Sequence, residues 1–413
     1  MSSKRPAPAT EDRFPPRLEL SFVEGTKRQM LVYEKVSWEL EKQTVGLRYG
    51  ENPGQPAALY RLVNGNLTLG EISQAMPDQP LASKPDILQP GKLLNQINIA
   101  DADTALSLLR YLMNEPTCAI VKHNNPCGVA QAPALLQAFT KAYFADREAV
   151  PGACLACNRP IDLATAEAIA ATEVDVVLAP EYEEGAAKRL AAKKRLCLLR
   201  INNIDALAKW VGQTHLDFTS LMDGGLILQW SLVPTALQRE DCRPASAMYR
   251  GKEFRIRRQP TPEEWNDLLF GWKIAMSVHS ASIVYVKRGI TVGIGIGGQD
   301  RITVAETTRH QALRKLADRL AWERFKIAYS RITDTQMRES IWNDAEELKG
   351  GLIGACMVSD GPLGSIESAK VGIDAGISAI IQPGGAENDY EVIRLCNENN
   401  VAMVFTDQRC FKH

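Results

Sequence analysis

The segment Lys122-His123-Asn124-Asn125-Pro126-Cys127-Gly128 has the clearest potential for chemistry in this chain. The apolar run before it, residues 118–121, is short and contains β-branched residues, which favours a buried strand, and Asn, Pro and Gly then favour a turn. Open α/β sheets bind ligands at such strand ends. There His123 could move a proton near neutral pH, while the Lys122 ammonium would keep it neutral and stabilise developing negative charge. A solvent-facing lysine beside a structural histidine is the alternative interpretation.

Two other segments carry residues suited to an anionic ligand. The loop Leu47-Arg48-Tyr49-Gly50-Glu51-Asn52-Pro53-Gly54-Gln55 places an arginine fork, which fits a phosphate, beside a tyrosine ring and hydroxyl. An ordinary surface turn is the alternative there. Asp175 lies within the apolar stretch 174–180, where an unpaired carboxylate is costly to bury. We therefore expect Asp175 either at a strand's open end, touching a ligand, or bonded to backbone donors.

The elements that must position these residues alternate between strand and helix. This alternation predicts an α/β layered fold with a mostly parallel sheet, preceded by short strands over residues 18–45. The expected strands are 150–157, 174–180, 197–201, 352–358 and 401–405, and the expected helices are 103–113, 132–145, 165–172, 185–195, 265–278 and 365–375.

The second half of the chain adds a capped helix, a hairpin and a charged helical stretch. Thr261, followed by Pro262 and by Glu264 three residues on, predicts a helix start. Strands are expected on both sides of Arg288-Gly289, and residues 304–348 are expected to form a helical insertion.

Two smaller patterns stand out in the same region. The glycines of 293–298 resemble a dinucleotide fingerprint only loosely, so they favour a backbone that passes close to a neighbouring group, with Arg301 just beyond. The strand endings Ile120-Val121-Lys122 and Tyr285-Val286-Lys287 hint at an internal duplication.

Composition excludes several classes of protein. The chain has 413 residues and a net charge of −1, so it lacks the electrostatic footprint of a nucleic-acid-binding protein. No apolar stretch approaches the roughly 20 residues that cross a bilayer, and nine cysteines without a signal peptide point to reduced thiols in the cytoplasm. Cys154 and Cys157 have the spacing of a zinc pair, but strand alternation would direct their sulfurs to opposite faces, so no metal is expected.

Five motifs occur in the order of one known family. The chain resembles the AICAR transformylase portion of the bifunctional purine-synthesis enzyme that also carries an IMP cyclohydrolase domain. The resemblance covers residues 47–413. Its motifs are Arg48-Tyr49-Gly50-Glu51-Asn52-Pro53, Lys122 to Gly128 as written above, Gln299-Asp300-Arg301-Ile302, Ile381-Gln382-Pro383-Gly384-Gly385, and Met403-Val404-Phe405-Thr406 through Arg409 and His413.

The resemblance implies a homodimer of chains that each contain two cytidine-deaminase-like α/β/α units with a helical insertion. The expected divisions are a flexible tail (1–16), a first unit (17–212), a second unit (213–303 and 350–413) and the insertion (304–349). The implied reaction moves a formyl group from 10-formyltetrahydrofolate to the 5-amino group of AICAR ribonucleotide, in IMP synthesis. Only 46 residues precede Leu47, whereas a cyclohydrolase domain needs roughly 200. We therefore expect a stand-alone transformylase and a separate cyclohydrolase that closes the ring.

Matching positions carry the family's functional residues onto this chain. His123 would be the general base for the AICAR amine, and Lys122 would stabilise charge on the formyl oxygen. In the family these sites lie at the dimer interface. The nucleotide would be held by Arg48, Tyr49, Gly152, Asp175, Arg301 and Arg409, and the folate would be contacted by Ile302, Glu367, Ala386 and Glu387.

Three departures from the family pattern bear on this assignment. Ala281 replaces an asparagine that helps to orient the catalytic histidine, so another group, such as His279, would have to do so. Residues 359–366 lack three aromatic rings that the family has, and Gly54 replaces a histidine. The alternatives are therefore AICAR formylation from another donor, or a non-catalytic AICAR-nucleotide-binding protein.

Overall fold

The computed structural model describes residues 14–40, 42–52, 55–64, 67–69, 72–73 and 79–413. Most of the predicted tail of residues 1–16, together with Pro53 and Gly54, therefore lies outside the described residues. By its contacts the chain divides into two compact units: unit 1 is Met1–Leu106 with Gly152–Val233, and unit 2 is Ser107–Pro151 with Pro234–His413. The domain divisions expected from the sequence stay a prediction.

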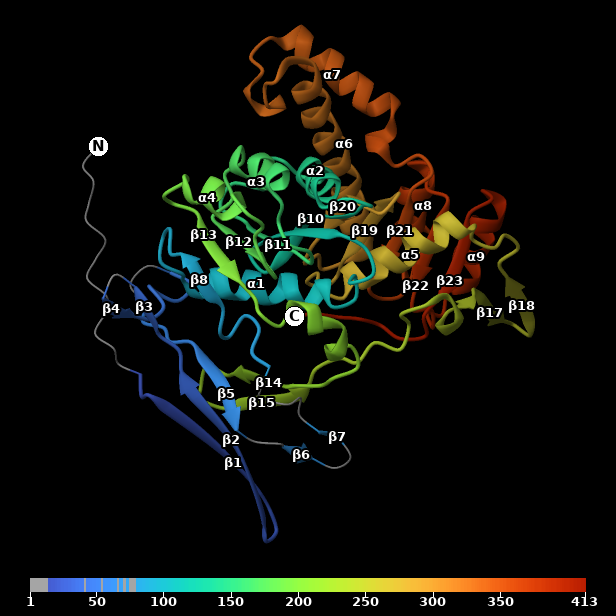
Figure 1. The fold of residues 1–413 in the computed structure, drawn as a ribbon. Helices are drawn as coiled ribbons and strands as arrows, with labels where there is room; N and C mark the ends of the chain where they lie inside the picture. The colour runs from blue at the N-terminus through green and yellow to red at the C-terminus, as the bar shows by residue number, and fades with distance from the viewer. Residues whose placement is uncertain (1–13, 41, 53–54, 65–66, 70–71, 74–78) are drawn as a thin grey trace. The chain divides into compact units, whose positions relative to one another are not determined.

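Unit 1 begins with a three-stranded antiparallel sheet, drawn in blue in Figure 1. Its apolar side packs on a small core of Leu31, Leu67 and Leu216. This region confirms the short strands expected over residues 18–45, and the chain turns from the first strand to the second between Glu24 and Lys27. The three-stranded sheet consists of β1 Arg17–Glu24, β2 Lys27–Lys35 and β5 Tyr60–Asn64. Three separate hairpins in unit 1 are formed by β3 Trp38–Leu40 with β4 Gln43–Val45, β6 Thr68–Leu69 with β7 Ile72–Ser73, and β14 Leu216–Ser220 with β15 Leu226–Trp230.

The α/β part of unit 1 contains three parallel strands and an antiparallel fourth in the order β11-β12-β13-β8. Strands β11 and β12 are buried along their whole length, as the continuous apolar runs of sequence suggested. Helix α1 leads from unit 1 into unit 2. The elements are β8 Asp86–Gln89, α1 Gln96–Leu109, β11 Cys154–Cys157, α3 Leu163–Ala170, β12 Val176–Ala179, α4 Ala186–Ala191 and β13 Cys197–Arg200.

Unit 2 contains a mixed sheet in the order β16-β23-β22-β21-β19-β20-β10-β9. The expected parallel pairing is present in β21-β22-β23, whereas the two hairpins and the edge strand β16 pair antiparallel. The strands are β9 Thr117–Lys122, β10 Asn125–Gln131, β16 Arg243–Pro244, β19 Ile283–Lys287, β20 Ile290–Gly295, β21 Cys356–Ser359, β22 Ala379–Gln382 and β23 Ala402–Phe405, with a separate hairpin of β17 Ser246–Tyr249 and β18 Lys252–Arg255.

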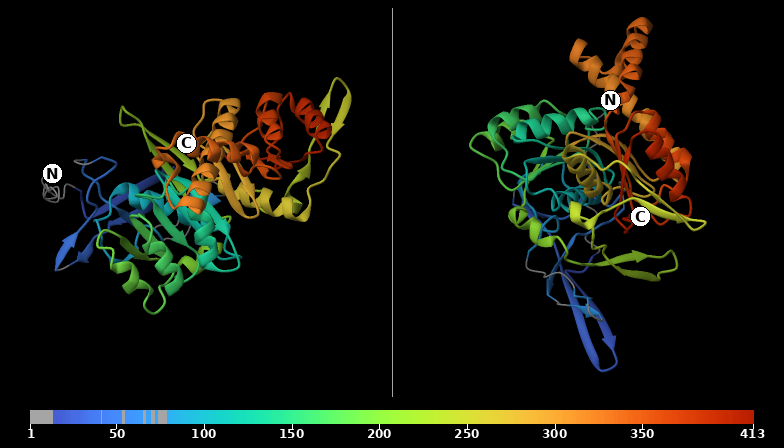
Figure 2. Two further views of the ribbon diagram at one scale, coloured as in Figure 1. Left: turned by 90° about the horizontal axis from the view of Figure 1, so that it is seen from above. Right: turned by 90° about the vertical axis from the view of Figure 1, so that its right-hand side faces the viewer.

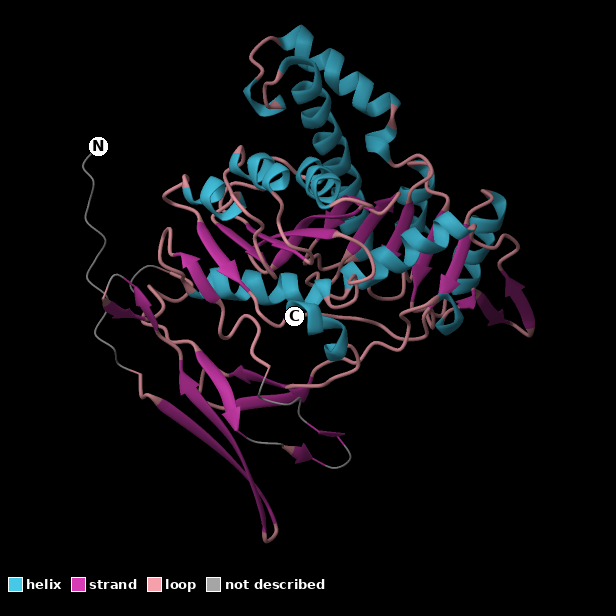
Figure 3. Cartoon of the chain, in the orientation of Figure 1, coloured by secondary structure: helices cyan, strands magenta, loops and turns pink. Residues whose placement is uncertain are grey.

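Helices pack along the sheet of unit 2 (Figure 3). Helix α2 contacts β9 and β10, and α5 contacts β19 and β21. The predicted helical insertion is confirmed as helical: α6 and α7 form an arm with its own apolar core. The first half of α6 packs on β20, and the outer part of the arm projects away from the sheet in the right-hand view of Figure 2. The helices are α2 Leu135–Ala145, α5 Pro262–Ala275, α6 Arg301–Phe325, α7 Thr335–Glu347, α8 Ile366–Asp374 and α9 Asp389–Glu398.

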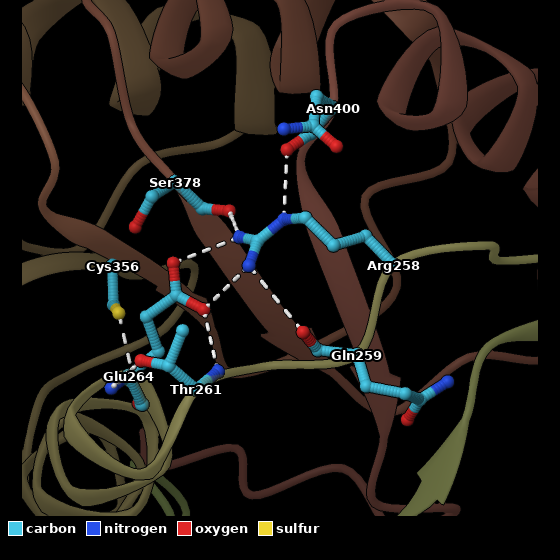
Figure 4. Close-up of polar contacts among 7 residues, drawn as sticks. All are labelled: Arg258, Gln259, Thr261, Glu264, Cys356, Ser378 and Asn400. Atoms are coloured by element: carbon cyan, nitrogen blue, oxygen red, sulfur yellow. Dashed lines mark hydrogen bonds and ion pairs between the residues drawn. The ribbon is translucent and has the colours of Figure 1, made fainter.

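The predicted start of α5 is confirmed and is tied to two strands. Thr261 and Glu264 form a capping box, with the Glu264 carboxylate accepting from the Thr261 amide at 2.8 Å. Arg258 reaches the same carboxylate through two bonds of 2.8 Å each and also donates to the carbonyls of Ser378 and Asn400 (Figure 4). Ser378 directly precedes β22 and Asn400 lies two residues before β23, so this arginine joins three segments that are distant in the sequence.

The glycine-rich stretch at the end of the β19–β20 hairpin passes close to α6, which accounts for Gly295 and Gly298. A Cβ on Gly295 would lie 1.9 Å from Thr308 Oγ1, and one on Gly298 would lie 1.9 Å from Val304 Cγ2. The expected close approach is therefore confirmed, and its neighbour is this helix.

Candidate functional site

The predicted catalytic turn lies in unit 2 and is shorter than the sequence suggested. His123 and Asn124 are the two residues between β9 and β10, and Lys122 pairs with Asn125. Their φ values of 53° and 61° are typical of a type I′ turn. The expectation of a turn through Gly128 is wrong, because Asn125–Gln131 form a strand with an irregular register between Pro126 and Gly128.

Gly128 has a packing role in this strand. A Cβ there would lie 2.2 Å from the Ala142 carbonyl oxygen of α2, so only glycine lets the helix approach. Asn125, Pro126 and Gly128, which suggested a long turn, therefore belong to a bulged strand that is covered by α2.

The side chains on either side of the turn are bonded to backbone carbonyls and leave the His123 imidazole free of hydrogen bonds to the part of the chain that the structure describes. Lys122 Nζ donates to the Pro151 carbonyl at 2.8 Å, and Asn125 Nδ2 donates to the His123 carbonyl at 3.0 Å. The His123 side chain is exposed, and no residue of the described chain hydrogen-bonds to its ring. Its two nitrogens are therefore available to a ligand.

His279 braces the turn from the next segment of unit 2. Its backbone amide donates to Asn125 Oδ1 at 3.0 Å, and its Nδ1 lies 2.9 Å from the same oxygen. An amide oxygen only accepts, so this contact assigns the proton to Nδ1 and leaves a lone pair on Nε2. Burial, followed by the charges of Lys412 and His413, lowers the pKa of His279 and favours this neutral form.

His279 was one group expected to replace the orienting asparagine missing at Ala281. The structure joins it to Asn125, so it positions the turn that carries His123. Direct orientation of the His123 ring by His279 stays a prediction. Sequence reasoning gave no means to find the Asn125 contact, because 154 positions separate the partners.

The C-terminal segment also contacts the turn. Lys412 Nζ donates to the carbonyls of Asn124, at 3.2 Å, and Ser277, at 3.3 Å. The Lys412 backbone amide donates to Ser280 Oγ at 3.1 Å. Sequence reasoning missed Lys412, although it lies inside the motif from Arg409 to His413.

Arg301 forms a buried ion pair that supports the same region. Its Nη1 lies 2.7 Å from Asp360 Oδ1, and its Nε donates to the Pro362 carbonyl at 2.7 Å. The Asp360 side chain is 0% exposed and also accepts from Ser280 Oγ at 2.6 Å. Two guanidinium nitrogens of the predicted phosphate ligand Arg301 are therefore already engaged within the protein.

Arg301 and Arg409, predicted separately, meet at one aromatic ring. Their guanidinium carbons lie 5.6 Å and 4.9 Å from the centroid of Phe411. A Cβ on Gly361 would lie 2.0 Å from Arg301 Nη2 and 2.5 Å from the Phe411 ring. Gly361, in the segment that departs from the family pattern, thus leaves room for this arginine and this ring.

The predicted folate residues are spread over three helix starts in unit 2. Ile302 is in the first turn of α6, Glu367 is exposed in the first turn of α8, and Ala386 and Glu387 lie in the loop before α9. Asp389 Oδ2 accepts from the amides of Gly385 (2.7 Å) and Ala386 (3.0 Å), which fixes that loop.

The remaining predicted nucleotide residues belong to unit 1. Arg48 Nη2 donates to the Tyr49 hydroxyl at 2.6 Å, and the guanidinium carbon lies 4.4 Å from the ring centroid. Arg48 Nε is buried without a hydrogen-bond partner among the described residues, a donor that a bound anion would satisfy. Gly152 has a φ of 82°, which favours glycine, and its amide donates to the Glu173 carbonyl.

Asp175 differs from its predicted environment. It precedes β12 rather than lying within it, and its Oδ2 is 2.9 Å from Lys92 Nζ. Lys92 therefore balances the charge of this half-buried carboxylate within the protein, and the contact of Asp175 with a ligand stays a prediction. No local pattern pointed to Lys92, which lies 83 positions away.

The Cys154 and Cys157 pair is buried in β11. Burial raises the pKa of the Cys154 thiol well above its usual value, which disfavours the thiolate that zinc would require. Among the described residues, no group of three His, Cys, Asp or Glu side chains is placed to hold a metal. Nor does this part of the chain contain a helix long and apolar enough to cross a membrane.

Comparisons with known proteins agree on one family. Residues 20–311 match the model described as AICARFT/IMPCHase bienzyme. The chain is 34% identical to the bifunctional purine biosynthesis protein PurH of Chlorobaculum parvum over 396 residues, which is 95% of this chain and 62% of that protein. The PurH of Aquifex aeolicus is 32% identical over 372 residues (90% and 60%), and that of Dinoroseobacter shibae is 36% identical over 372 residues (89% and 59%). The chain thus spans about three fifths of the length of these relatives.

Proposed function

This chain belongs to the AICARFT/IMPCHase bienzyme family, and from that premise we propose that it transfers a formyl group from 10-formyltetrahydrofolate to the 5-amino group of AICAR ribonucleotide. The observation that supports this most directly is the β9–β10 turn. It presents an exposed imidazole next to Lys122, on a backbone whose carbonyls accept hydrogen bonds from Asn125 and Lys412. A binding protein has no need of a braced base at this position.

The proposed chemistry is an acyl transfer between two nitrogens. The AICAR amine attacks the formyl carbon and His123 accepts the proton that the amine loses. The His123 imidazolium then returns a proton to N10, and the carbon–N10 bond breaks to release tetrahydrofolate. The amine is conjugated to the imidazole carboxamide and is a weak nucleophile, so a positioned base matters, typically by roughly 10²–10⁴-fold. The Lys122 ammonium would stabilise the oxyanion that forms at the formyl oxygen.

For the nucleotide, the support comes from unsatisfied or cationic groups. The buried Arg48 Nε lacks a partner among the described residues, and Arg409 is exposed beside Phe411. We propose that these arginines bind the 5′-phosphate, with Tyr49, Gly152, Asp175 and Arg301 completing the nucleotide site. The donor would contact Ile302, Glu367, Ala386 and Glu387.

A different formyl donor is the second candidate. It is favoured by the altered segment 359–366, where Gly361 and the Arg301 guanidinium take the space next to Phe411. The nucleotide acceptor and the role of His123 would be unchanged under this alternative.

One assay separates these candidates. Purified protein is incubated with AICAR ribonucleotide and 10-formyltetrahydrofolate, and the release of tetrahydrofolate is followed together with the formylated nucleotide. Turnover supports the proposal. Formylated product only with formate and ATP would favour another donor, and nucleotide binding without product in either mixture would indicate a non-catalytic binder.

We further propose that the chain acts as a homodimer with sites shared between subunits, and that a separate protein closes the ring to IMP. Light scattering tests the first point, and mixing two inactive variants with defects in different site residues tests whether sites are shared. Supplying the formylated nucleotide and looking for IMP tests the second. IMP formation by this chain would contradict it.

A further inference from the structure

The hairpin that carries the predicted catalytic turn has a structural counterpart in the second half of the chain. Strands β19 and β20 are also joined by two residues, Arg288 and Gly289, with φ values of 53° and 68°. Lys287 ends β19 just as Lys122 ends β9. Both turns are therefore of the type I′ kind, and each directly follows a lysine.

The two lysines also make the same contact. Lys122 Nζ donates to the Pro151 carbonyl at 2.8 Å, and Lys287 Nζ donates to the Ile353 carbonyl at 2.5 Å. Each acceptor residue is followed by a glycine with positive φ, then by alanine and by a cysteine that begins a strand. The two stretches are Pro151-Gly152-Ala153-Cys154 and Ile353-Gly354-Ala355-Cys356.

One difference between the two hairpins determines what chemistry the β19–β20 hairpin could support. Arg288 stands where the first copy has His123. A guanidinium stays protonated and donates to anions, whereas it cannot accept a proton near neutral pH. The second copy is thus suited to holding an anion but not to acting as a base.

A cavity of about 370 Å³ adjoins this second turn, within unit 2. Five cations line it: Lys287 and Arg288 from the hairpin, Lys141 from α2, and Lys315 and Arg319 from α6. Glu323 is the acid in the lining, and it forms an exposed i,i+4 pair with Arg319 on α6, at 3.7 Å; Lys315 is paired with Asp146 at 3.0 Å.

Three of these cations, Lys141, Lys287 and Arg288, have no ion-pair partner among the described residues; Lys287 donates instead to the Ile353 carbonyl. Asp267 sits behind the turn and accepts from the amides of Arg288 and Gly289, at 2.7 Å each, so it fixes the backbone from which Arg288 projects. Asp267 offsets part of the charge of Lys287 and Arg288, and the remaining positive charge of the lining would favour an anion in the cavity.

Apolar groups supply the rest of the contact surface. Phe144, Ile290 and Leu316 are among the lining residues. A cavity at the small end of the usual range for ligand sites, with apolar walls and several cations, fits a small molecule that joins a phosphate to an apolar or aromatic body.

We propose that this cavity is a second, non-catalytic site for a small organic phosphate. It uses the duplicated Lys-turn arrangement with an arginine in place of the histidine. The proposal does not depend on formyl transfer, since no residue of the predicted catalytic turn lines the cavity.

Phenyl phosphate is a suitable probe, because it combines a dianion with a ring. Calorimetric titrations would compare the full chain with Lys141→Ala, Arg288→Ala and the double variant. Arg309→Ala is the matched control, since it removes an exposed arginine from α6 that does not line the cavity. Each removed cation is expected to weaken binding roughly tenfold, and added salt should weaken it further.

The conservative variants Lys141→Arg and Arg288→Lys should retain most of the affinity, which separates charge from a general structural effect. Thermal melting of each variant checks its folding. A crystal grown with phenyl phosphate should place the phosphoryl group beside Lys141 or Arg288. Equal affinity in the wild-type protein and in a folded double variant would overturn the proposal, as would phosphoryl density found only at another site.

Discussion

His279 Nδ1 lies 2.9 Å from Asn125 Oδ1, and the His279 amide donates to the same oxygen at 3.0 Å. One side-chain oxygen of the β9–β10 hairpin is thus held by two donors of a segment 154 positions away. Because Asn125 also donates to the His123 carbonyl, the brace extends to the residue that we propose as the base.

The first prediction concerns this brace. Asn125→Ala should lower kcat more than it raises the KM for the nucleotide, because a small displacement of a catalytic group can cost about 10²-fold in rate. Steady-state kinetics would measure both constants. Asn202→Ala, which removes an exposed amide in unit 1, serves as a control. An unchanged kcat in Asn125→Ala would show that the brace has no catalytic role.

The second prediction concerns His123 itself. His123→Ala should reduce turnover by roughly 10²–10⁴-fold, the usual contribution of a general base, with little change in nucleotide affinity. The exposed ring contacts no described residue through a hydrogen bond, so the fold should tolerate its removal. The matched control is His215→Ala, which deletes another exposed imidazole, paired with Asp217. A near-normal rate would remove His123 from the mechanism.

The third prediction concerns Gly361. Gly361→Ala would place a methyl group 2.0 Å from Arg301 Nη2, and two bonds of 2.7 Å to Asp360 and Pro362 hold that guanidinium in place. We expect a lower melting temperature and a higher KM for the nucleotide. Gly46→Ala, where a Cβ meets nothing within 4 Å, should change neither. If Gly361→Ala behaved like the control, the contact of Arg301 and Phe411 with residue 361 would be unimportant.

The fourth prediction concerns the pH dependence of stability. Burial alone would raise the pKa of Glu264, but hydrogen bonds from Arg258, Ser378 and the Thr261 amide outweigh it, so the pKa is lowered. A carboxyl group with a lowered folded-state pKa stabilises the fold above its unfolded pKa of about 4.3, and that contribution is lost as the pH falls through the folded value.

Glu264→Gln should therefore cost roughly 1.5–3 kcal/mol of unfolding free energy at pH 7, and the difference from the wild type should shrink in acid. Denaturant titrations at several pH values would measure it. Glu263→Gln, at the exposed neighbouring position, is the control. A difference between wild type and Glu264→Gln that stayed constant down to pH 3 would show that ionisation of Glu264 is not the cause.

Local chemistry in the sequence predicted much of the fold. The Thr261 capping box depends on residues three apart, and the Arg288-Gly289 turn depends on adjacent residues, so both could be identified before the structure. The helical arm followed from its pattern over many residues. These features succeed because their energetics are contained in short windows of the chain.

The errors have the opposite origin. Asp175 was placed inside a strand, but Lys92 neutralises it from 83 positions away. The turn at His123 was drawn too long because Pro126 and Gly128 suggest a loop, whereas the approach of α2 to Gly128 explains the glycine. Contacts such as His279 with Asn125 and Lys412 with Asn124 leave no local pattern, and only the folded chain brings them together.

The Arg258 network has a consequence for motion in unit 2 (Figure 4). The Arg258 guanidinium donates hydrogen bonds to the carbonyls of Ser378 and Asn400 and to the Glu264 carboxylate. None of these three segments can therefore open alone without breaking its hydrogen bonds to this arginine. Deuterium uptake at the first turn of α5 and at the entrances of β22 and β23 should accordingly rise and fall together, as a single opening event.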